Sequence, residues 1–226
     1  MGNPLIHNLD RVSAILASLP DLFVFTGGAM ISLYVNEILW DEIRPTKDVD
    51  CVVEIYSRIE YYSLAERLRL VGLQECKDPE APLCRWVFQD LIVDVMPCDP
   101  QVLGFTNRWY KSGIANKITY RLPSSREIWI FPPIYLLASK VEAFLGRGKD
   151  LRLSKDIEDI VTLLDGCEML AEHFHQSPLE VKTFLGSWFK ENREDLQEAV
   201  LCFLPLSSSG REDIVFDLIT TFSQAS

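Results

Sequence analysis

The chain has 226 residues, 48% of them hydrophobic, which is enough to build the core of one large domain or two small ones. Its 33 acidic residues outnumber its 22 basic ones, and the net charge of −11 argues against a protein that coats nucleic acid, because phosphate binding depends on clustered Lys and Arg. No apolar run approaches the roughly 20 residues that cross a bilayer, and the first residues lack the pattern of a secretory signal. We therefore expect a cytoplasmic protein with no membrane segment.

Helical and strand patterns alternate in the first half of the chain. In order, hydrophobic spacing predicts a helix over 5–19, a strand over 22–25, a helix over 29–40, a strand over 47–55, a helix over 57–70 and a hairpin of strands over 85–88 and 91–96. The hairpin turns at Gln89 and Asp90, and Gly27 and Gly28 separate the first strand from the next helix. This alternation favours a sheet flanked by helices.

Three aspartates interrupt the predicted strands. Asp48 and Asp50 share one face of their strand because side chains alternate, and Asp94 lies in an otherwise apolar strand of the hairpin. A carboxylate in a buried strand is costly unless a cation compensates it. Carboxylate oxygens are ligands that Mg²⁺ prefers, so the three residues predict a magnesium site if their strands are neighbours.

The glycine turn would supply the other half of a nucleotide site. Gly27 and Gly28 allow the backbone to approach a phosphate closely, since neither carries a Cβ. The amino terminus of the helix predicted over 29–40 would offer unpaired N–H groups and the positive end of its dipole. Metal-binding carboxylates beside a phosphate-binding turn indicate phosphoryl chemistry.

From Pro132 onward the pattern becomes mainly helical. Helical spacing covers 134–145, 154–164, 179–192, 195–203 and 211–222. Ser177 and Glu180 have the spacing of a capping box, with Pro178 at the first helical position. We expect a catalytic core over 1–125 and a helical subdomain over 126–226, which places the chain in the α+β class.

The motifs of the first half resemble a known superfamily. FVFTGGAM, TKDVDCVVE and LIVDVMP are similar to the glycine turn, the paired acids and the third acid of the nucleotidyltransferase superfamily, to which DNA polymerase β and aminoglycoside-modifying enzymes belong. The resemblance implies a small mixed sheet flanked by helices and transfer of an NMP from an NTP, with Mg²⁺ or Mn²⁺. It also implies that Asp48, Asp50 and Asp94 are the metal ligands and catalytic carboxylates.

Within that superfamily the chain most resembles the AbiEii-type toxins. RPTKDVD is similar to their R-x-T-x-D-h-D stretch, and LASKVEAFLGR and KDIEDI are similar to their lysine-bearing helix and later acidic stretch. The nucleotide contacts that the resemblance implies are Gly27, Gly28, Ala29, Arg44, Lys47, Lys140 and Arg147. Lys140 would also act in catalysis. In this branch the acceptor would be RNA or a protein, and a cognate antitoxin would be a partner.

Several of these residues keep two interpretations. Lys140 either binds the β- or γ-phosphate or belongs to the ordinary polar face of an amphipathic helix. Asp156 and Asp159 stand in the first turns of a helix, where acids favour the dipole without any catalytic role. Ala29 lacks the hydroxyl that is common at its position, so a protein that binds nucleotide or a partner without catalysis is an alternative.

The acceptor has more than one interpretation as well. Basic residues between Arg108 and Arg126, with Trp109, Tyr110 and Tyr120 available for stacking, favour RNA. The net charge of −11 suits instead an acidic cleft for a cationic small molecule, as expected for the aminoglycoside and lincosamide nucleotidyltransferases that the chain also resembles.

Overall fold

The computed structural model describes residues 3–147 and 150–224, which form two compact units. The first unit comprises the residues up to Met30 together with Pro45–Pro132, and the second comprises Ile31–Arg44 together with the residues from Pro133 onward. The expected division into 1–125 and 126–226 stays a prediction about domains. Within the described ranges, no helix is both long and apolar enough to span a membrane.

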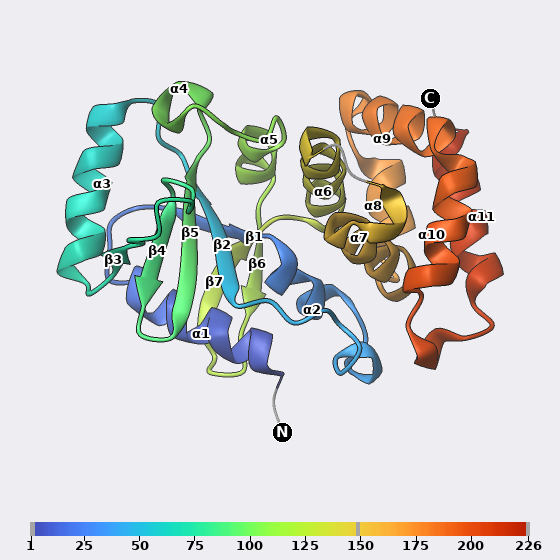
Figure 1. Cartoon of the computed structure of the whole chain (residues 1–226), viewed down its shortest axis with the longest axis horizontal. Helices are drawn as coiled ribbons and strands as arrows, with labels where there is room; N and C mark the ends of the chain where they lie inside the picture. The colour runs from blue at the N-terminus through green and yellow to red at the C-terminus, as the bar shows by residue number, and fades with distance from the viewer. Residues whose placement is uncertain (1–2, 148–149, 225–226) are drawn as a thin grey trace. The chain divides into compact units, whose positions relative to one another are not determined.

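The first unit is built on a seven-stranded sheet (Figure 1). Its elements are α1 (Pro4–Leu16), β1 (Phe23–Thr26), the 3₁₀ turn η1 (Gly28–Met30), β2 (Asp48–Val53), α3 (Arg58–Leu70), β3 (Gln74–Glu75), β4 (Arg85–Phe88), β5 (Leu91–Pro97), α4 (Pro100–Leu103), α5 (Tyr110–Ala115), β6 (Ile118–Arg121) and β7 (Glu127–Ile130). Apart from the helix over 29–40, the predicted strands and helices of this half are present, and the short β3, α4, α5, β6 and β7 are additional.

The strands lie in the order β3-β4-β5-β2-β1-β7-β6. β2 and β5 run parallel and side by side, whereas β1 is antiparallel to β2 and parallel to β7. β4 and β5 form the predicted hairpin, in which Phe88 pairs with Leu91 and Gln89 adopts a φ of 55° in the turn. The sheet is mixed and carries helices, so the predicted α+β fold class is confirmed.

The single helix predicted over 29–40 is wrong. The segment divides into η1, the four-residue helix α2 (Ile31–Tyr34) and a second 3₁₀ turn, η2 (Glu37–Leu39). Asn36 breaks the helix because its backbone is extended and its side chain accepts a hydrogen bond from the N–H of Ile38, which caps η2. The glycine turn is therefore followed by short helical pieces, which lack the aligned dipole of a long helix.

Helix starts follow local capping chemistry. Ser57 accepts a hydrogen bond from the N–H of Glu60, whose carboxylate accepts one from the N–H of Ser57, so α3 begins with a capping box. The capping box predicted at Ser177 is wrong, although α9 begins within one residue of the expected start. The Ser177 hydroxyl donates instead to the carbonyl of Phe174, in the last turn of a preceding helix that the spacing did not predict.

The second unit is helical. It contains α2, η2, α6 (Pro133–Arg147), η3 (Leu151–Leu153), α7 (Lys155–Gly166), α8 (Leu170–Gln176), α9 (Leu179–Glu191), α10 (Arg193–Phe203), η4 (Leu206–Ser208) and α11 (Glu212–Ser223). Its core is aromatic: the rings of Phe174 and Phe222 stack with centroids 4.0 Å apart, and Phe189 meets Phe222 edge-on at 5.4 Å. The hydrophobic spacing did not predict α8 (Leu170–Gln176), because its seven residues make only about two helical turns.

Candidate active site

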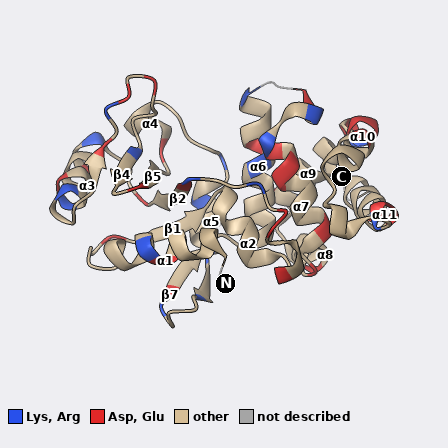
Figure 2. Ribbon diagram, turned by 60° about the horizontal axis from the view of Figure 1, so that its bottom comes forward, with Lys and Arg blue, Asp and Glu red and all other residues tan. Residues whose placement is uncertain are grey.

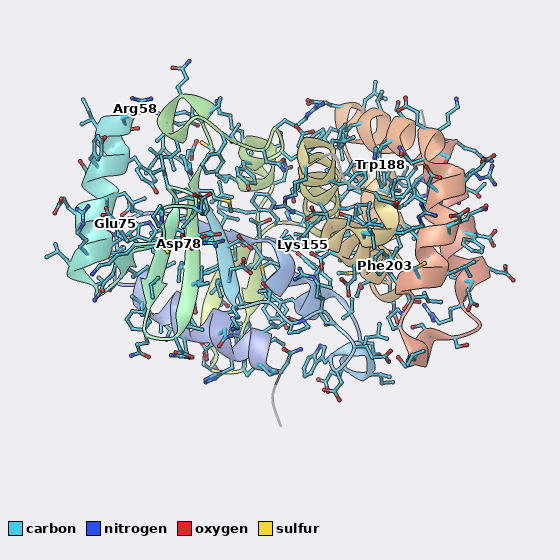
Figure 3. All side chains as sticks on the ribbon, in the orientation of Figure 1. Arg58, Glu75, Asp78, Lys155, Trp188 and Phe203 are labelled. Carbon is cyan, nitrogen blue, oxygen red and sulfur yellow. The ribbon has the colours of Figure 1, made fainter. Side chains whose placement is uncertain are left out.

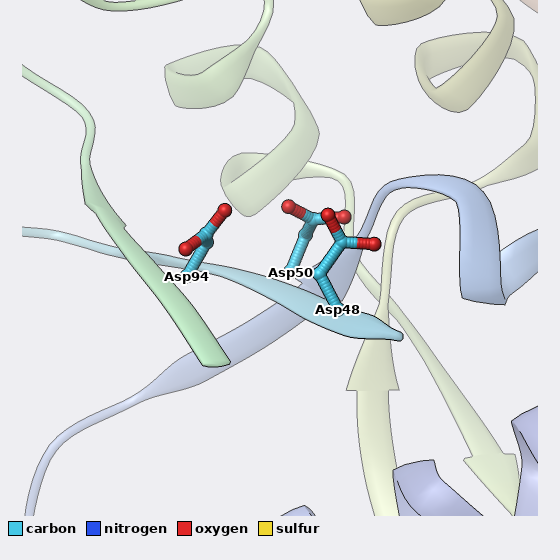
Figure 4. Close-up of side chains that lie close together, drawn as sticks. All are labelled: Asp48, Asp50 and Asp94. Carbon is cyan, nitrogen blue, oxygen red and sulfur yellow. The ribbon is translucent and has the colours of Figure 1, made fainter. Parts of the chain in front are cut away.

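Three carboxylates converge on one face of the sheet in the first unit (Figure 4). Asp48 and Asp50 project from β2, and Asp94 projects from β5, where it lies directly opposite Asp50 in the parallel register. One oxygen of each carboxylate lies within 4.8 Å of those of the other two. The strand alternation that pairs Asp48 with Asp50 thus brings all three side chains to the same point.

Gly27 makes room for this cluster. Its φ of 82° lies in the left-handed region that favours glycine, and a Cβ placed on it would lie 1.9 Å from Oδ2 of Asp50. Gly28 and Ala29 belong to η1 and are buried, so the Ala29 methyl group belongs to the core. Glycine is therefore required at position 27 mainly because the carboxylate of Asp50 occupies the space that a side chain would need.

Thr26 places one more oxygen beside the carboxylates. It pairs with Asp50 across β1 and β2, so the two side chains share a face of the sheet. Thr26 is 2% exposed, and its hydroxyl has no hydrogen-bond partner among the described residues. A buried hydroxyl without a partner is costly, so a ligand or a water molecule beside Asp50 would satisfy it.

Arg85 supplies a cation beside Asp94, the buried member of the cluster. Its Nε and Nη2 donate to the two oxygens of Asp94 at 2.9 and 2.7 Å, and Nη2 lies 3.8 Å from Oδ2 of Asp48. The hydrogen bond to Asp94 raises the pKa of Arg85. Sequence reasoning missed this residue, although counting outward from the turn at Gln89 and Asp90 places Arg85 opposite Asp94.

The cluster fits a small divalent cation. Three carboxylates gather here around the guanidinium of Arg85, and carboxylates are the donors that Mg²⁺ and Mn²⁺ favour. An octahedral ion with ligands at ~2.0–2.1 Å places neighbouring donors about 3 Å apart and opposite ones about 4 Å apart. Modest side-chain rotations bring oxygens that already lie within 4.8 Å to that geometry. Asp48, Asp50 and Asp94 are therefore the residues that would hold the ion.

Thr46 and Lys47 lead into the metal-binding strand. The Thr46 hydroxyl donates to Oδ1 of Asp48, which fixes the orientation of that carboxylate. The backbone carbonyl of Lys47 accepts from the N–H of Ile92 at 3.4 Å, while its side chain is exposed. Lys47 thus extends the pairing of β2 with β5 and leaves its ammonium group in solvent.

The other predicted nucleotide-binding cations lie in an ion-pair cluster of the second unit. Lys140 pairs with Asp159 and, at 4.0 Å, with Asp156, while Arg147 pairs with Asp156. Arg44 lies 3.3 Å from Asp159. Lys140 is 9% exposed and both aspartates are 3% exposed or less, so these groups are buried partners. The interpretation of Lys140 as an ordinary surface lysine is therefore wrong.

The predicted stacking platform is only partly available. Trp109 is 1% exposed and belongs to the core, so its proposed role in stacking is wrong. Tyr110 donates its hydroxyl to the sulfur of Met96 and meets Phe131 edge-on. Two basic residues of the same stretch are paired with acids, Arg121 with Glu127 and Arg126 with Asp10. This stretch offers less to RNA than its sequence suggested.

The fold is similar to that of two solved structures. No protein-family model and no curated protein sequence matches the chain. A nucleotidyltransferase-like antigenic protein from Paracoccidioides brasiliensis is similar in structure with a TM-score of 0.53 and 19% identity, over 93% of this chain and 98% of the other. The antibiotic-resistance factor ANT(2'')-Ia is similar with a TM-score of 0.51 and 10% identity, over 88% and 97%. The chain thus has the fold of nucleotidyltransferase-like proteins.

Proposed function

We propose that the protein is a metal-dependent nucleotidyltransferase that moves an NMP from an NTP to an acceptor hydroxyl. The observation that carries the proposal is the convergence of Asp48, Asp50 and Asp94 from adjacent parallel strands, beside the turn at Gly27. The nucleotidyltransferase-like fold agrees with this activity, and AbiEii-type toxins are the branch that the sequence motifs favour.

Each residue of the site has its own role in the proposed reaction. A bound Mg²⁺ or Mn²⁺ would neutralise triphosphate charge and polarise the α-phosphate. Asp48 and Asp50 would hold that ion from their fixed places on β2, and the Thr26 hydroxyl beside Asp50 is available to a phosphate oxygen. Asp94 accepts the proton of the acceptor hydroxyl at a carboxylate oxygen, with Arg85 holding its orientation. The acceptor oxygen then bonds to the α-phosphorus, the bond to the bridging oxygen breaks and pyrophosphate leaves.

A role of Arg44, Lys140 and Arg147 in binding the triphosphate is a proposal that the sequence resemblance alone supports. In the structure each is paired with Asp156 or Asp159, so a phosphate would compete with these carboxylates. The two aspartates then hold the cations in place within the second unit, which accounts for acids that are far more buried than helix-dipole residues need to be. Gly28 and Ala29 would contact the nucleotide through their backbone, and Lys47 would do so through its charge next to the carboxylates.

The test is transfer of label from each α-labelled NTP to total RNA, to cell lysate and to the protein itself. We expect labelled product only with Mg²⁺ or Mn²⁺, and a loss of at least about 10²–10³-fold in Asp50→Asn, because one electrostatic contributor is typically worth that much. Asp217→Asn, an exposed aspartate on α11, is the matched control and should retain activity. Undiminished transfer by an Asp48→Asn, Asp50→Asn double variant would exclude the proposed site.

Two alternatives keep the same site and separate in the same assay. A small-molecule acceptor, favoured by the acidic chain and by the aminoglycoside-modifying enzymes among its resemblances, predicts label on an added aminoglycoside or lincosamide and resistance in cells. A non-catalytic protein, favoured by Ala29, predicts nucleotide binding without release of pyrophosphate. An antitoxin partner predicts that co-expression of a neighbouring gene product suppresses toxicity.

A further inference from the structure

Two short helical turns of the second unit, η2 and η4, join to form one surface. They are far apart in the sequence, and the carboxylate of Glu42 connects them by accepting from the N–H groups of Leu206 and Ser207, the latter at 3.1 Å. The chain reaches η4 from the end of α10, where Figure 3 labels Phe203. We call this surface, together with the end of α7 and the loop after it, the η2–η4 surface. It is formed by residues 36–42, 165–169 and 206–211.

The end of α7 holds the η2–η4 surface in place. Asp165, in the last turn of that helix, is buried, and its carboxylate accepts from the hydroxyl of Ser208 and from Nε of Arg211. The next residue, Gly166, lets η2 pack closely, because a Cβ there would lie 2.8 Å from the side chain of Leu39. The surface is thus formed beforehand, so a partner loses little entropy in ordering it.

Large apolar side chains are exposed around a small pocket of this surface. Ile38 is 74% exposed, Leu206 is 89% exposed and Met169 is 50% exposed. Ile38 lines the pocket, and the other two are each next in sequence to a lining residue. The pocket volume of about 190 Å³ is below the ~300–1,000 Å³ of small-molecule sites but has room for one side chain. Exposed apolar groups that are rimmed by polar ones mark a surface for protein contact.

The charged side chains of the η2–η4 surface are mainly acidic. Its three segments contain a single base, Arg211, which is bound to Asp165. They contain five acids: Glu37, Asp41, Glu42, Asp165 and Glu168. Within residues 3–147 and 150–224, no ion pair engages Glu37, Asp41 or Glu168. Figure 2 shows acidic segments in red on the ribbon beside α8, the helix that follows this last acid. The surface therefore attracts Lys and Arg side chains.

Charge complementarity selects among the molecules that could cover this surface. A second copy related by a two-fold axis would place the same acids against one another, because such a contact uses the same patch on both copies. An anionic lipid surface would repel the acids as well. A protein segment that carries Lys or Arg beside an apolar side chain matches both the exposed apolar groups and the acids around them.

We propose that the η2–η4 surface docks a basic, amphipathic segment of a partner protein. An apolar side chain of that segment enters the pocket and contacts Ile38 and Leu206, and its Lys and Arg side chains pair with Glu37, Asp41 and Glu168. This docking goes beyond nucleotidyl transfer and does not depend on it, because none of these residues belongs to the carboxylate cluster of the first unit.

The test follows binding of a fluorescent amphipathic peptide of Lys and Leu to the full chain by fluorescence anisotropy. Peptides of equal length with Glu in place of Lys, or Ser in place of Leu, should bind at least about tenfold more weakly. Ile38→Ser and Leu206→Ser should each weaken binding of the Lys–Leu peptide about tenfold, the change expected when an apolar side chain of this size no longer becomes buried. Leu179→Ser, at a residue 76% exposed on α9, is the matched control and should bind like the wild type.

The acids are tested by the dependence of this binding on salt. The double variant Glu37→Gln, Asp41→Asn should bind the Lys–Leu peptide more weakly and with less sensitivity to salt, because attraction between exposed charges is screened by ions. Glu191→Gln, Glu194→Gln removes the same number of exposed acids elsewhere on the second unit and should keep the salt dependence of the wild type. An equal change in the two double variants would show that only net charge matters and would contradict the proposed docking.

Amide hydrogen exchange locates the bound peptide. We expect the Lys–Leu peptide to slow exchange in residues 36–42 and 206–211, and to leave binding of a fluorescent NTP with Mg²⁺ unchanged. Slower exchange only in other segments, or equal peptide affinity in the wild type and Ile38→Ser, overturns the proposal whether or not nucleotidyl transfer is real. A wild type that sediments as a dimer while Leu206→Ser sediments as a monomer also overturns it, because a second copy would then cover the surface.

Discussion

Gly27 and Asp50 occupy adjoining space so closely that any side chain on Gly27 would overlap the Asp50 carboxylate. A Cβ would lie 1.9 Å from Oδ2, and the φ of 82° already disfavours other residues. The turn and the metal-binding strand are thus fitted to one another, so the turn also determines where a candidate ligand oxygen lies.

Gly27→Ala should abolish activity by displacing Asp50. We expect transfer to fall to the level of Asp50→Asn and the free energy of unfolding to fall by more than the ~1 kcal/mol that a left-handed backbone alone costs. Gly210→Ala is the control, because Gly210 has a φ of 91° but no atom near the position of its Cβ. Urea denaturation of both variants measures the difference. Equal destabilisation would show that the overlap with Asp50 relaxes without consequence.

Arg85→Gln should destabilise the protein in a metal-dependent way. Removing the guanidinium leaves the 6% exposed Asp94 without its cation, for which we expect a loss of about 2–4 kcal/mol. Because Mg²⁺ supplies the missing charge, added Mg²⁺ should raise the melting temperature of Arg85→Gln more than that of the wild type.

The double variant Arg85→Gln, Asp94→Asn controls for this effect. Without the buried charge it should recover most of the stability and lose the extra response to Mg²⁺. Melting curves with and without an excess of Mg²⁺ measure both the stability and the response to the ion. If the single and double variants respond alike, Arg85 does not act as the counter-cation of Asp94.

Asp159→Ala should be among the most destabilising substitutions in the second unit. It leaves Lys140 buried without its nearest carboxylate and also removes a partner of Arg44. Breaking a buried pair in this way costs about 3–5 kcal/mol. Urea denaturation at pH 7 measures it, with Glu127→Ala as the control, since the pair of Glu127 with Arg121 is exposed and should contribute little. Similar losses in the two variants would contradict the burial of the cluster.

Thiol alkylation at pH 8 should modify Cys202 long before Cys84 and Cys167. Burial raises the pKa of Cys84 to about 12 and that of Cys167 to about 11, and the thiolate is the reactive form, whereas Cys202 is exposed. Peptide mass spectrometry after a short treatment with iodoacetamide shows the order, and all six thiols should react in denaturant. Equal rates for Cys84 and Cys202 in the native protein would contradict the packing behind the carboxylate strands.

Local sequence patterns predicted much of the candidate site because strand alternation and hairpin register are local properties. Asp48 and Asp50 share a face by alternation, and the turn at Gln89 and Asp90 fixes which residues of β4 and β5 lie opposite one another. The same patterns failed for the helix over 29–40, where the side chain of Asn36 begins a new turn, and for Ser177, whose hydroxyl serves the end of α8.

By itself, then, the sequence determined the α+β class, the residues able to bind a metal and the turn beside them, since these depend on residue type and period. Only the tertiary structure decided that β5 lies next to β2 and that Lys140 is buried against Asp159. The physical reason is that strand order and ion pairing depend on contacts between segments far apart in the chain, and residue spacing carries no information on which distant segment supplies the partner.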